Sequence, residues 1–218
     1  MIGIVDYGMG NLHSVTKALE RIGHTPFVSE DPAELKKAER LILPGVGSFR
    51  DGMEELSKRG LTAFLQEWAA NERPLLGICL GMQLLFEQSE ENGETEGLSL
   101  LPGRVIRFSG ITSDGERYKV PHMGWNKLRF HQEGHEILKG LAPGHVYFVH
   151  SYVVQSEDES VLIASAEYDV QVPAVVAKGS VWGTQFHPEK SSTLGMQMLR
   201  NFTSDVGSEG RVYNLSGN

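Results

Sequence analysis

The chain has 218 residues, 40% of them hydrophobic, so it can bury a substantial core in one domain or in two tightly joined domains. Its formal net charge of −8 argues against nucleic acid as a partner. A single cysteine excludes an internal disulfide framework and fits a reducing compartment. No apolar run approaches the ~20 residues that span a bilayer, and the N-terminus lacks the features of a signal peptide. We therefore expect a cytoplasmic protein with no membrane partner.

Strands and helices alternate in the first part of the chain. Ile2 to Val5 predicts a strand, and Asn11 is a plausible N-cap for a helix that Gly23 ends. Residues 25–28, 32–38 and 40–43 predict a strand, a helix and a third strand. This order is typical of a parallel sheet with right-handed crossovers.

The stretch from Gly77 to Gly81 holds the one cysteine, Cys79, between an apolar strand and the start of a helix. Small–x–nucleophile–x–small at such a turn is the pattern of a nucleophile elbow, because only glycine tolerates the crowded backbone. The helix start would favour the reactive thiolate. A lone cysteine is more often a small core residue, but the flanking glycines favour a nucleophile here.

The loop Gly45-Val46-Gly47 follows the third strand at the same edge of the predicted sheet. Two glycines in three residues allow unusual backbone angles and a close approach of N–H groups to a ligand. Beside an elbow, this loop predicts part of an oxyanion hole. The donors would be the backbone N–H of Leu80 and one N–H from Val46 or Gly47.

The second half of the chain is richer in strands. An amphipathic helix around residues 61–68 and a surface loop at 90–97 precede it. Strands are then predicted near residues 104–108, 126–130, 146–150, 161–166, 174–177 and 181–186. A last helix follows Ser191 or Ser192. The predicted fold is α/β, with a mostly parallel central sheet flanked by helices and an additional antiparallel section. We expect one domain over residues 1–205 and a flexible tail over 206–218.

The segment His187-Pro188-Glu189 comes directly after the last predicted strand. Proline holds His187 in an extended conformation, and residues i and i+2 of an extended chain point the same way. Glu189 can therefore hold the imidazole in one tautomer. With Cys79 these residues predict a Cys-His-Glu triad that attacks a carbonyl carbon, in which His187 carries the proton from the thiol to the leaving amine.

Two patterns that would indicate a cofactor or a metal are incomplete. Gly8 and Gly10 follow the first strand, but His13 stands where a dinucleotide fingerprint needs a small residue. His131 and His135 have the spacing of helical metal ligands, but Gly134 and polar neighbours indicate a loop. We expect neither a cofactor nor a metal.

The segment Gly77 to Gln83, with Gln185 to Glu189, resembles the triad (class I) glutamine amidotransferases, which hydrolyse glutamine through a thioester and pass on ammonia. Within that family the chain is similar to the glutaminase subunits of imidazole glycerol phosphate synthase, from histidine biosynthesis. The narrower match depends on Asp6 to Leu12, Pro44 to Gly47, Pro121 to Asn126, Tyr147 to Tyr152 and Gln185 to Ser191. It extends from residue 3 to about residue 200, and nothing beyond Asp205 matches.

The resemblance implies further roles. Gln83, Glu91, Ser151 and Tyr152 would contact the substrate L-glutamine. The Gly45–Gly47 loop would keep its amide turned away until the partner is activated. Near the partner interface and the ammonia exit would lie Met9, Asn11, His122, Trp125 and Asn126.

The partner would be a (β/α)8-barrel cyclase subunit, joined to this chain as a heterodimer. Ammonia released to solvent would be lost by protonation, and the sequence offers no second catalytic constellation to use it. The cyclase would use it to make imidazole glycerol phosphate and aminoimidazole carboxamide ribotide.

Three alternatives stay open at the level of sequence. A stand-alone cysteine hydrolase or peptidase would be active without a partner. A regulatory binding module would keep the fold without turnover and would tolerate loss of Cys79. Another glutaminase of the same superfamily would feed a different synthase, although the segment Pro121 to Asn126 argues against it.

Overall fold

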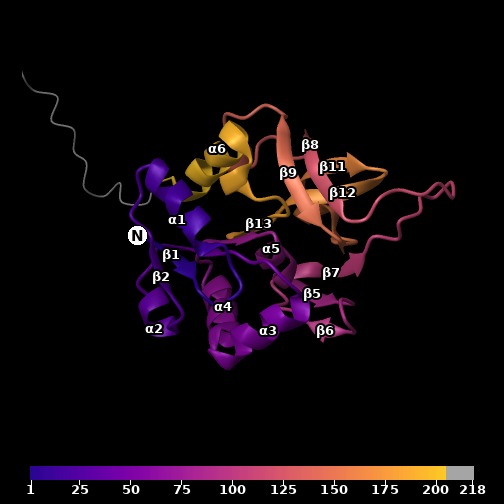
Figure 1. Ribbon diagram of the computed structural model, residues 1–218. Helices are drawn as coiled ribbons and strands as arrows, with labels where there is room; N and C mark the ends of the chain where they lie inside the picture. The colour runs from indigo at the N-terminus through magenta and orange to yellow at the C-terminus, as the bar shows by residue number, and fades with distance from the viewer. Residues whose placement is uncertain (205–218) are drawn as a thin grey trace, which may run out of the picture.

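The computed structural model describes residues 1–204, which form a large mixed sheet with helices on both faces and a smaller second sheet (Figure 1). The large sheet consists, in spatial order, of β2 (Phe27–Ser29), β1 (Ile2–Val5), β3 (Arg40–Leu43), β4 (Leu75–Ile78), β13 (Val181–Thr184), β12 (Val170–Lys178), β11 (Leu162–Tyr168), β8 (His122–Phe130) and β9 (His145–His150).

The direction of the strands divides this sheet into two halves. The pairs from β2 to β13 are parallel, and those from β13 to β9 are antiparallel. The predicted α/β fold is confirmed, and the antiparallel section proves to be the continuation of the same sheet. The parallel strands β1 and β4 are buried along their whole length, as central parallel strands are when helices cover both faces.

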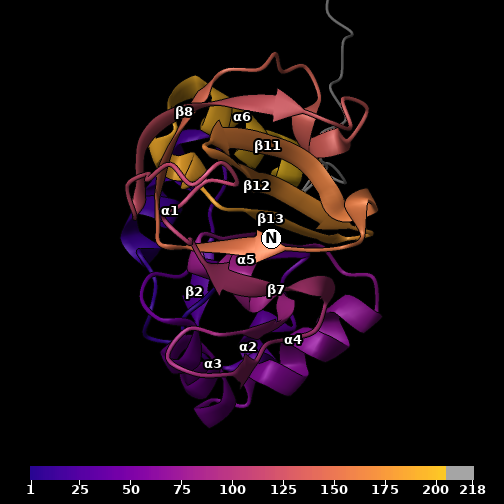
Figure 2. The same ribbon diagram turned by 90° about the vertical axis from the view of Figure 1, so that its right-hand side faces the viewer.

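Helices pack on both sides of the sheet (Figure 2). One face carries α1 (Leu12–Arg21) and α6 (Ser192–Thr203), and the other carries α2 (Pro32–Leu35), α3 (Phe49–Lys58) and α4 (Leu61–Ala70). The short α5 (Leu80–Leu84) follows β4. Three single 3-10 turns complete the set: η1 (Glu136–Leu138), η2 (Glu159–Val161) and η3 (Pro188–Lys190).

Side-chain caps fix where three of these helices begin. The side chain of Asn11 accepts the N–H of Ser14 at the start of α1 (3.3 Å), as predicted. Asp31 and Ser48 do the same for α2 and α3. Each cap satisfies an N–H group that has no partner inside its helix.

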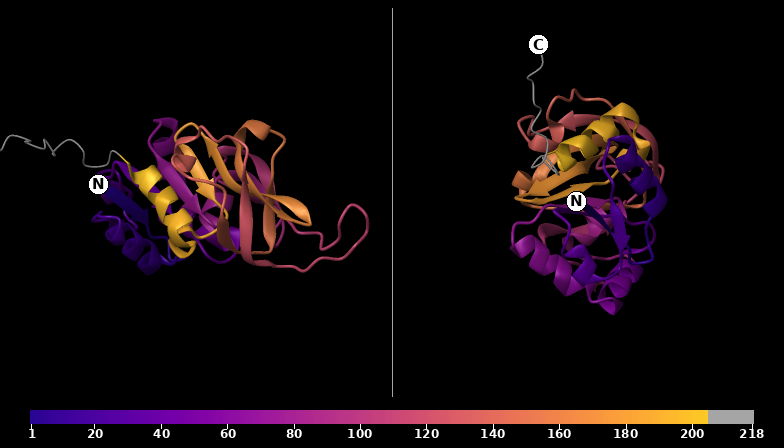
Figure 3. Two further views of the ribbon diagram at one scale, coloured as in Figure 1. Left: turned by 90° about the horizontal axis from the view of Figure 1, so that it is seen from above. Right: turned by 90° about the vertical axis from the view of Figure 1, so that its left-hand side faces the viewer.

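The second sheet has the order β10 (Tyr152–Gln155), β7 (Leu101–Arg107), β5 (Phe86–Ser89) and β6 (Thr95–Glu96). It lies beside the end of α3 in Figure 1. The segment between β7 and β8 projects from the body and is closed by a bridge between Ile111 and Arg117 (Figure 3).

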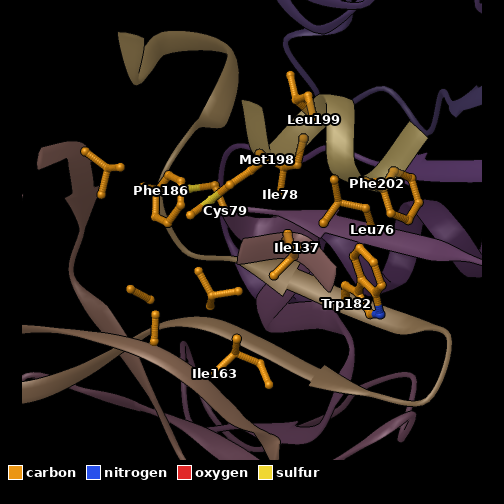
Figure 4. Close-up of a cluster of buried hydrophobic side chains, with 14 of the residues drawn as sticks. Leu76, Ile78, Cys79, Ile137, Ile163, Trp182, Phe186, Met198, Leu199 and Phe202 are labelled. Atoms are coloured by element: carbon orange, nitrogen blue, oxygen red, sulfur yellow. The ribbon is translucent and has the colours of Figure 1, made fainter. Parts of the chain in front are cut away.

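Each face of the large sheet has its own buried core. On the side of α1 and α6, the core includes Trp182, Met198 and Phe202, and Cys79 lies at its edge near Phe186 (Figure 4). Complete burial of such a side chain contributes about 1.5–3 kcal/mol. The nucleophile candidate is therefore held by a packed interior rather than by a surface loop.

Some local structure was not foreseen from the sequence. The predicted helix after Cys79 is short and ends at Leu84, because Phe86 begins a strand that pairs with β7. In the segment from Pro121 to Asn126, the residues from His122 onward form the first half of the long strand β8, which therefore begins earlier than the predicted strand at 126–130. The helix α3 and the strands β5, β6 and β10 were not predicted. The predicted tail, 206–218, and the predicted domain end at residue 205 lie outside the described residues.

Candidate active site

The turn at Cys79 has the strained backbone of a nucleophile elbow. Cys79 has φ 55° and ψ −113°, a conformation that non-glycine residues rarely adopt. A Cβ atom on Gly77 would lie 2.5 Å from the carbonyl oxygen of Gly81. One on Gly81 would lie 1.8 Å from the carbonyl oxygen of Leu43. The close approach of these backbones therefore requires glycine on both sides of the cysteine.

The His187 and Glu189 side chains form an ion-pair contact behind the cysteine. Nδ1 of His187 lies 2.8 Å from Oε1 of Glu189, and the two side chains are 5% and 1% exposed. Burial would lower the pKa of His187, but its interactions with Cys79 and Glu189 outweigh this effect and raise it from 6.5 to about 10. His187 is thereby held as the imidazolium near neutral pH, and the carboxylate at Nδ1 leaves Nε2 for proton exchange with the thiol.

A pocket of about 340 Å³ opens over the cysteine. It brings together residues from the elbow, from the loop after β3, from the loop after β5, from the junction of β9 and β10 and from the loop after β13. Its lining residues are Val46, Gly47, Cys79, Leu80, Gln83, Glu91, Val149, His150, Ser151, Tyr152 and His187. Every predicted oxyanion and substrate-binding residue is among them, and so are two of the three triad residues. The third, Glu189, supports His187 from behind.

Two of the three candidate oxyanion donors, the N–H groups of Leu80 and Val46, are engaged by backbone carbonyls, while the third candidate, Gly47, lines the pocket. The N–H of Val46 donates to the carbonyl oxygen of Met9 over 2.8 Å. The N–H of Leu80 donates to the carbonyl oxygen of Gly45 over 3.3 Å. The carbonyl of Gly45 and the N–H of Val46 belong to the same peptide unit. The same peptide group therefore carries one donor, the N–H of Val46, and accepts the other, the N–H of Leu80.

Tyr7 holds the loop after β3 from the buried side. Its hydroxyl donates to the carbonyl oxygen of Pro44 over 2.7 Å in the interior. Burial and the nearby Cys79 raise the pKa of Tyr7 far above its usual value, so the hydroxyl stays a proton donor. A Cβ atom on Gly45 would lie 2.3 Å from this hydroxyl, so only glycine fits beside Tyr7 at that position. The sequence alone did not single out Tyr7, since an aromatic residue after a strand is most simply a core residue.

Two of the predicted substrate-binding side chains, Gln83 and Glu91, each form a hydrogen bond to the protein backbone. Gln83 donates from Nε2 to the carbonyl oxygen of Tyr152 over 3.2 Å. Oε2 of Glu91 accepts the N–H of Phe49 over 2.9 Å, at the first residue of α3. Burial raises the pKa of Glu91, although this hydrogen bond opposes the change. Glu91 also lines the pocket, so its carboxyl group can meet a ligand there.

The predicted interface residues are not all accessible. Trp125 is 54% exposed on β8, and Met9 and Asn11 are partly exposed near the loop after β3. His122 is only 2% exposed and stacks between Phe148 and Tyr168, so its side chain cannot contact a partner directly in this arrangement. Asn126 is half-buried and donates to the carbonyl oxygen of Glu167.

His122 belongs to a pair of buried imidazoles that the sequence did not reveal. Its Nδ1 lies 3.0 Å from Nε2 of His150, whose Nδ1 lies 2.7 Å from the carbonyl oxygen of Tyr152. Burial lowers the pKa of His122 to about 4 and that of His150 to about 3. Both rings are therefore neutral near pH 7, and the pair supports the strand junction that lines the pocket.

Neither a metal centre nor a membrane span occurs in the part of the chain that the structure describes. Residues 1–204 contain no group of three or more His, Cys, Asp or Glu side chains that could hold a metal ion. Over the same residues, every helix is too short or too polar to cross a bilayer. His131 instead contacts the hydroxyl of Ser165, and His135 caps η1.

Cys79 lies on a strained elbow at the carboxyl end of the central strand β4, beside a buried His–Glu pair. This is the arrangement of a triad amidotransferase. The family model for class-I glutamine amidotransferases matches residues 3–206, and the chain belongs to that family. The predicted family and the predicted enzyme class, a glutamine amidotransferase, are thereby confirmed.

Relatives narrow this placement to the HisH branch of the family. The chain is 63% identical over 206 residues to imidazole glycerol phosphate synthase subunit HisH of Halalkalibacterium halodurans, covering 94% of this chain and 96% of the relative. It is also 63% identical over 202 residues to the HisH subunit of Geobacillus kaustophilus, covering 93% and 95%. A solved structure described as a glutamine amidotransferase has a TM-score of 0.72 at 21% identity over 93% of this chain and 96% of that one. The latter likeness concerns the fold alone.

Proposed function

We propose that this chain is the glutaminase subunit of an imidazole glycerol phosphate synthase. It hydrolyses L-glutamine to glutamate and ammonia and delivers the ammonia to a cyclase subunit in the cytoplasm. The observation that carries this proposal is the pocket in which Cys79, His187 and the amide of Gln83 converge, with Glu189 paired to His187 from behind. The names of the relatives at 63% identity support the assignment to this synthase.

The reaction proceeds through a thioester. The Cys79 thiolate attacks the carboxamide carbon of glutamine and forms a C–S bond, and the carbonyl electrons move to oxygen. The imidazolium of His187 protonates the nitrogen, so ammonia leaves as the carbonyl re-forms. Neutral His187 then takes a proton from water, which attacks the thioester carbon. Collapse of the second tetrahedral intermediate releases glutamate and regenerates the thiolate–imidazolium pair.

The oxyanion hole is closed in the arrangement described above. A developing oxyanion needs N–H donors that point at it, and the donors of Leu80 and Val46 are engaged elsewhere. Rotation of the Gly45–Val46 peptide would release both at once. Two glycines flank Val46, so the rotation meets little steric resistance. We infer that this chain alone turns over slowly and that the activated partner favours the rotated peptide.

Substrate recognition uses the polar groups that remain free in the pocket. The carboxyl group of Glu91 would take the α-ammonium of glutamine, while Gln83 and the Ser151–Tyr152 segment would hold other polar atoms of the substrate. An amino acid carries a charge of each sign, so a pocket that binds it needs polar groups at both ends. No step of this hydrolysis calls for a cofactor or a metal.

The partner would cover the mouth of this pocket. Two exposed apolar side chains line it, Val46 (45%) and Val149 (40%), and two more, Met123 (59%) and Trp125 (54%), extend from Val149 along β8. Met123 and Val149 lie opposite each other on β8 and β9. Exposed apolar residues beside a catalytic pocket are typical of an interface, and a (β/α)8-barrel cyclase that seals this pocket would prevent loss of ammonia.

The test is glutamate production from glutamine by the purified chain, alone and then mixed with a cyclase subunit and its nucleotide ligand. We expect low activity alone, a large rise in the mixture and no activity in either case for Cys79→Ala. High activity alone that the cyclase does not change would instead identify a stand-alone hydrolase. Turnover by Cys79→Ala near the unsubstituted level would remove the cysteine from the mechanism.

A further inference from the structure

Gln185 is a buried side chain that the mechanism above does not use. It is 1% exposed and follows the last residue of β13, two positions before His187. Residues i and i+2 of an extended segment point to the same side, so the Gln185 amide faces the elbow as His187 does. A buried amide is retained at such a place only where its polar atoms are hydrogen-bonded.

A chain of three hydrogen bonds joins Tyr152 to Cys79, and Gln185 takes part in two of them. Nε2 of Gln83 donates to the carbonyl oxygen of Tyr152 over 3.2 Å and to Oε1 of Gln185 over 3.1 Å. Nε2 of Gln185 lies 4.0 Å from Sγ of Cys79 and donates to it. The side-chain amides of Gln83 and Gln185 thus form a short chain from a backbone carbonyl to the sulfur atom.

The direction of this chain is determined by the backbone. Side-chain amides can usually be turned either way, but the carbonyl oxygen of Tyr152 can only accept a hydrogen bond. Gln83 must therefore direct its NH2 group there, and its second N–H points at Gln185. If Gln185 were turned over, two NH2 groups would face each other. Its oxygen must face Gln83, and its NH2 group must face the sulfur.

We propose that Gln185 is a positioning residue for the hydrolysis: it donates a hydrogen bond to the sulfur of Cys79 and holds the amide of Gln83 in one orientation. This inference rests on the proposed function, in which Cys79 is the nucleophile and Gln83 contacts glutamine. An N–H donor stabilises a sulfur that carries negative charge more than a neutral thiol. Both N–H groups of Gln83 are engaged, so Oε1 is the atom that it offers to an N–H group of the substrate.

Other groups around the sulfur also influence its ionisation. The titratable side chains that interact with Cys79 or share its pocket are His187, Tyr7, Tyr152, His150 and Glu91. Substitution of Gln185 leaves all five in place. A change in the reactivity of Cys79 would therefore report on the amide itself.

The experiment measures the rate at which iodoacetamide alkylates Cys79 as a function of pH, on the full-length chain without a partner. Because the chain has one cysteine, the label reports a single site. Gln185→Met removes the donor and keeps the length of the side chain. Gln185→Glu keeps the oxygen that accepts from Gln83 and places a carboxylate oxygen against the sulfur. Thr184→Val is the matched control, since its buried hydroxyl donates to the carbonyl oxygen of Phe186.

We expect the pH midpoint of alkylation to rise by roughly 0.5–1 unit in the Met variant and by more in the Glu variant, where like charges meet. The control should keep the midpoint of the unsubstituted chain. With the cyclase present, the Met variant should raise KM for glutamine because Gln83 loses its anchor. The Glu variant should mainly lower kcat.

Unchanged midpoints in the Met and Glu variants would overturn the proposal, and so would a Glu midpoint below the Met one. Far-UV circular dichroism and thermal melting establish that each variant is folded. If the Met variant does not fold, the Glu variant decides alone, since it retains the hydrogen bond to Gln83. The proposed function is judged separately, by glutaminase activity of the unsubstituted chain and its loss in Cys79→Ala.

Discussion

The backbone N–H of Val46 donates to the carbonyl oxygen of Met9 over 2.8 Å, so it is not available to an oxyanion at Cys79. The carbonyl on the other side of the same peptide holds the N–H of Leu80. The proposed nucleophile Cys79, the proposed base His187 and the carboxylate of Glu189 lie together, while the N–H groups of Val46 and Leu80 are engaged elsewhere. We therefore propose that glutamine hydrolysis depends on a change in this one peptide group.

Val46→Pro tests this dependence. Proline removes the N–H and fixes φ near −65°, so the loop cannot supply its donor in any orientation. We expect partner-stimulated glutaminase activity to fall by about 10²–10³-fold, the usual cost of one oxyanion donor. Affinity for the cyclase is measured in parallel by titration calorimetry, because Val46 also belongs to the proposed docking surface and the loss of activity must be compared at saturating partner.

Val46→Ala is the control for the loss of the valine side chain. It keeps the N–H and the freedom of φ, so stimulation should stay within a few-fold of the unsubstituted chain. Full stimulation of the proline variant would show that the Val46 donor is not part of the oxyanion hole.

Glu189→Gln addresses the ionised pair. The carboxylate helps to raise the pKa of His187, so its replacement by a neutral amide should lower that pKa. Less of the enzyme then holds a thiolate beside an imidazolium at neutral pH. We expect kcat with the partner to fall by at least ~10²-fold. The rate of Cys79 alkylation below pH 7 should fall with it.

The matched control is Glu157→Gln, which makes the same replacement of a carboxylate by an amide at an exposed position outside the site. Its kcat and its alkylation profile should equal those of the unsubstituted chain. A Glu189→Gln enzyme with an unchanged alkylation profile would mean that this carboxylate does not influence the thiolate.

The site could be predicted because its chemistry depends on short motifs. The glycines on both sides of Cys79 and the proline after His187 are required by local backbone geometry, and local geometry is encoded in neighbouring residues. The same holds for the buried strands β1 and β4, whose apolar runs are continuous. These residues identify the family before any fold is known.

Other features depend on contacts between distant parts of the chain. His122 is buried because Phe148 and Tyr168 stack on its two faces, and neither lies near it in the sequence. The run after Cys79 looks helical as far as Phe86, but pairing with β7 makes a strand of its last part. Local propensity is overridden in such cases by tertiary pairing. The orientation of the Gly45–Val46 peptide is also not encoded locally, because glycine permits either one.

Trp125→Ala tests the proposed docking surface. The indole is 54% exposed on β8 and lies 5.8 Å from the ring of Tyr147, so it is a preformed aromatic anchor. Large aromatic residues at the centre of an interface cost about 2–4 kcal/mol when truncated, which corresponds to an increase in Kd of about 30- to 1000-fold. We expect an increase of that order for the cyclase. The isolated chain should keep its melting temperature.

Val28→Ala serves as the control, since Val28 is 42% exposed on β2, at the other edge of the sheet from β9. Its Kd should be unchanged. Equal affinities for the Trp125 and Val28 variants would place the cyclase on another face of the chain.

The buried His122–His150 pair predicts how stability depends on pH. Burial lowers the pKa of His150 from 6.5 to about 3, so the folded chain holds the neutral ring while the unfolded chain binds a proton near pH 6. The unfolded state therefore binds more protons between these values, and stability rises with pH there. The stability that the neutral His150 ring contributes is complete above about pH 6.5 and is lost as the pH falls toward 3.

Urea unfolding at pH 7.5, 6.0 and 5.0 should show a free energy of unfolding that decreases by about 1–3 kcal/mol over this range. His150→Gln should be less stable at pH 7.5 and should lose part of this slope, whereas His13→Gln, at an exposed position on α1, should keep it. Identical slopes for the two variants would mean that the acid sensitivity comes from other groups.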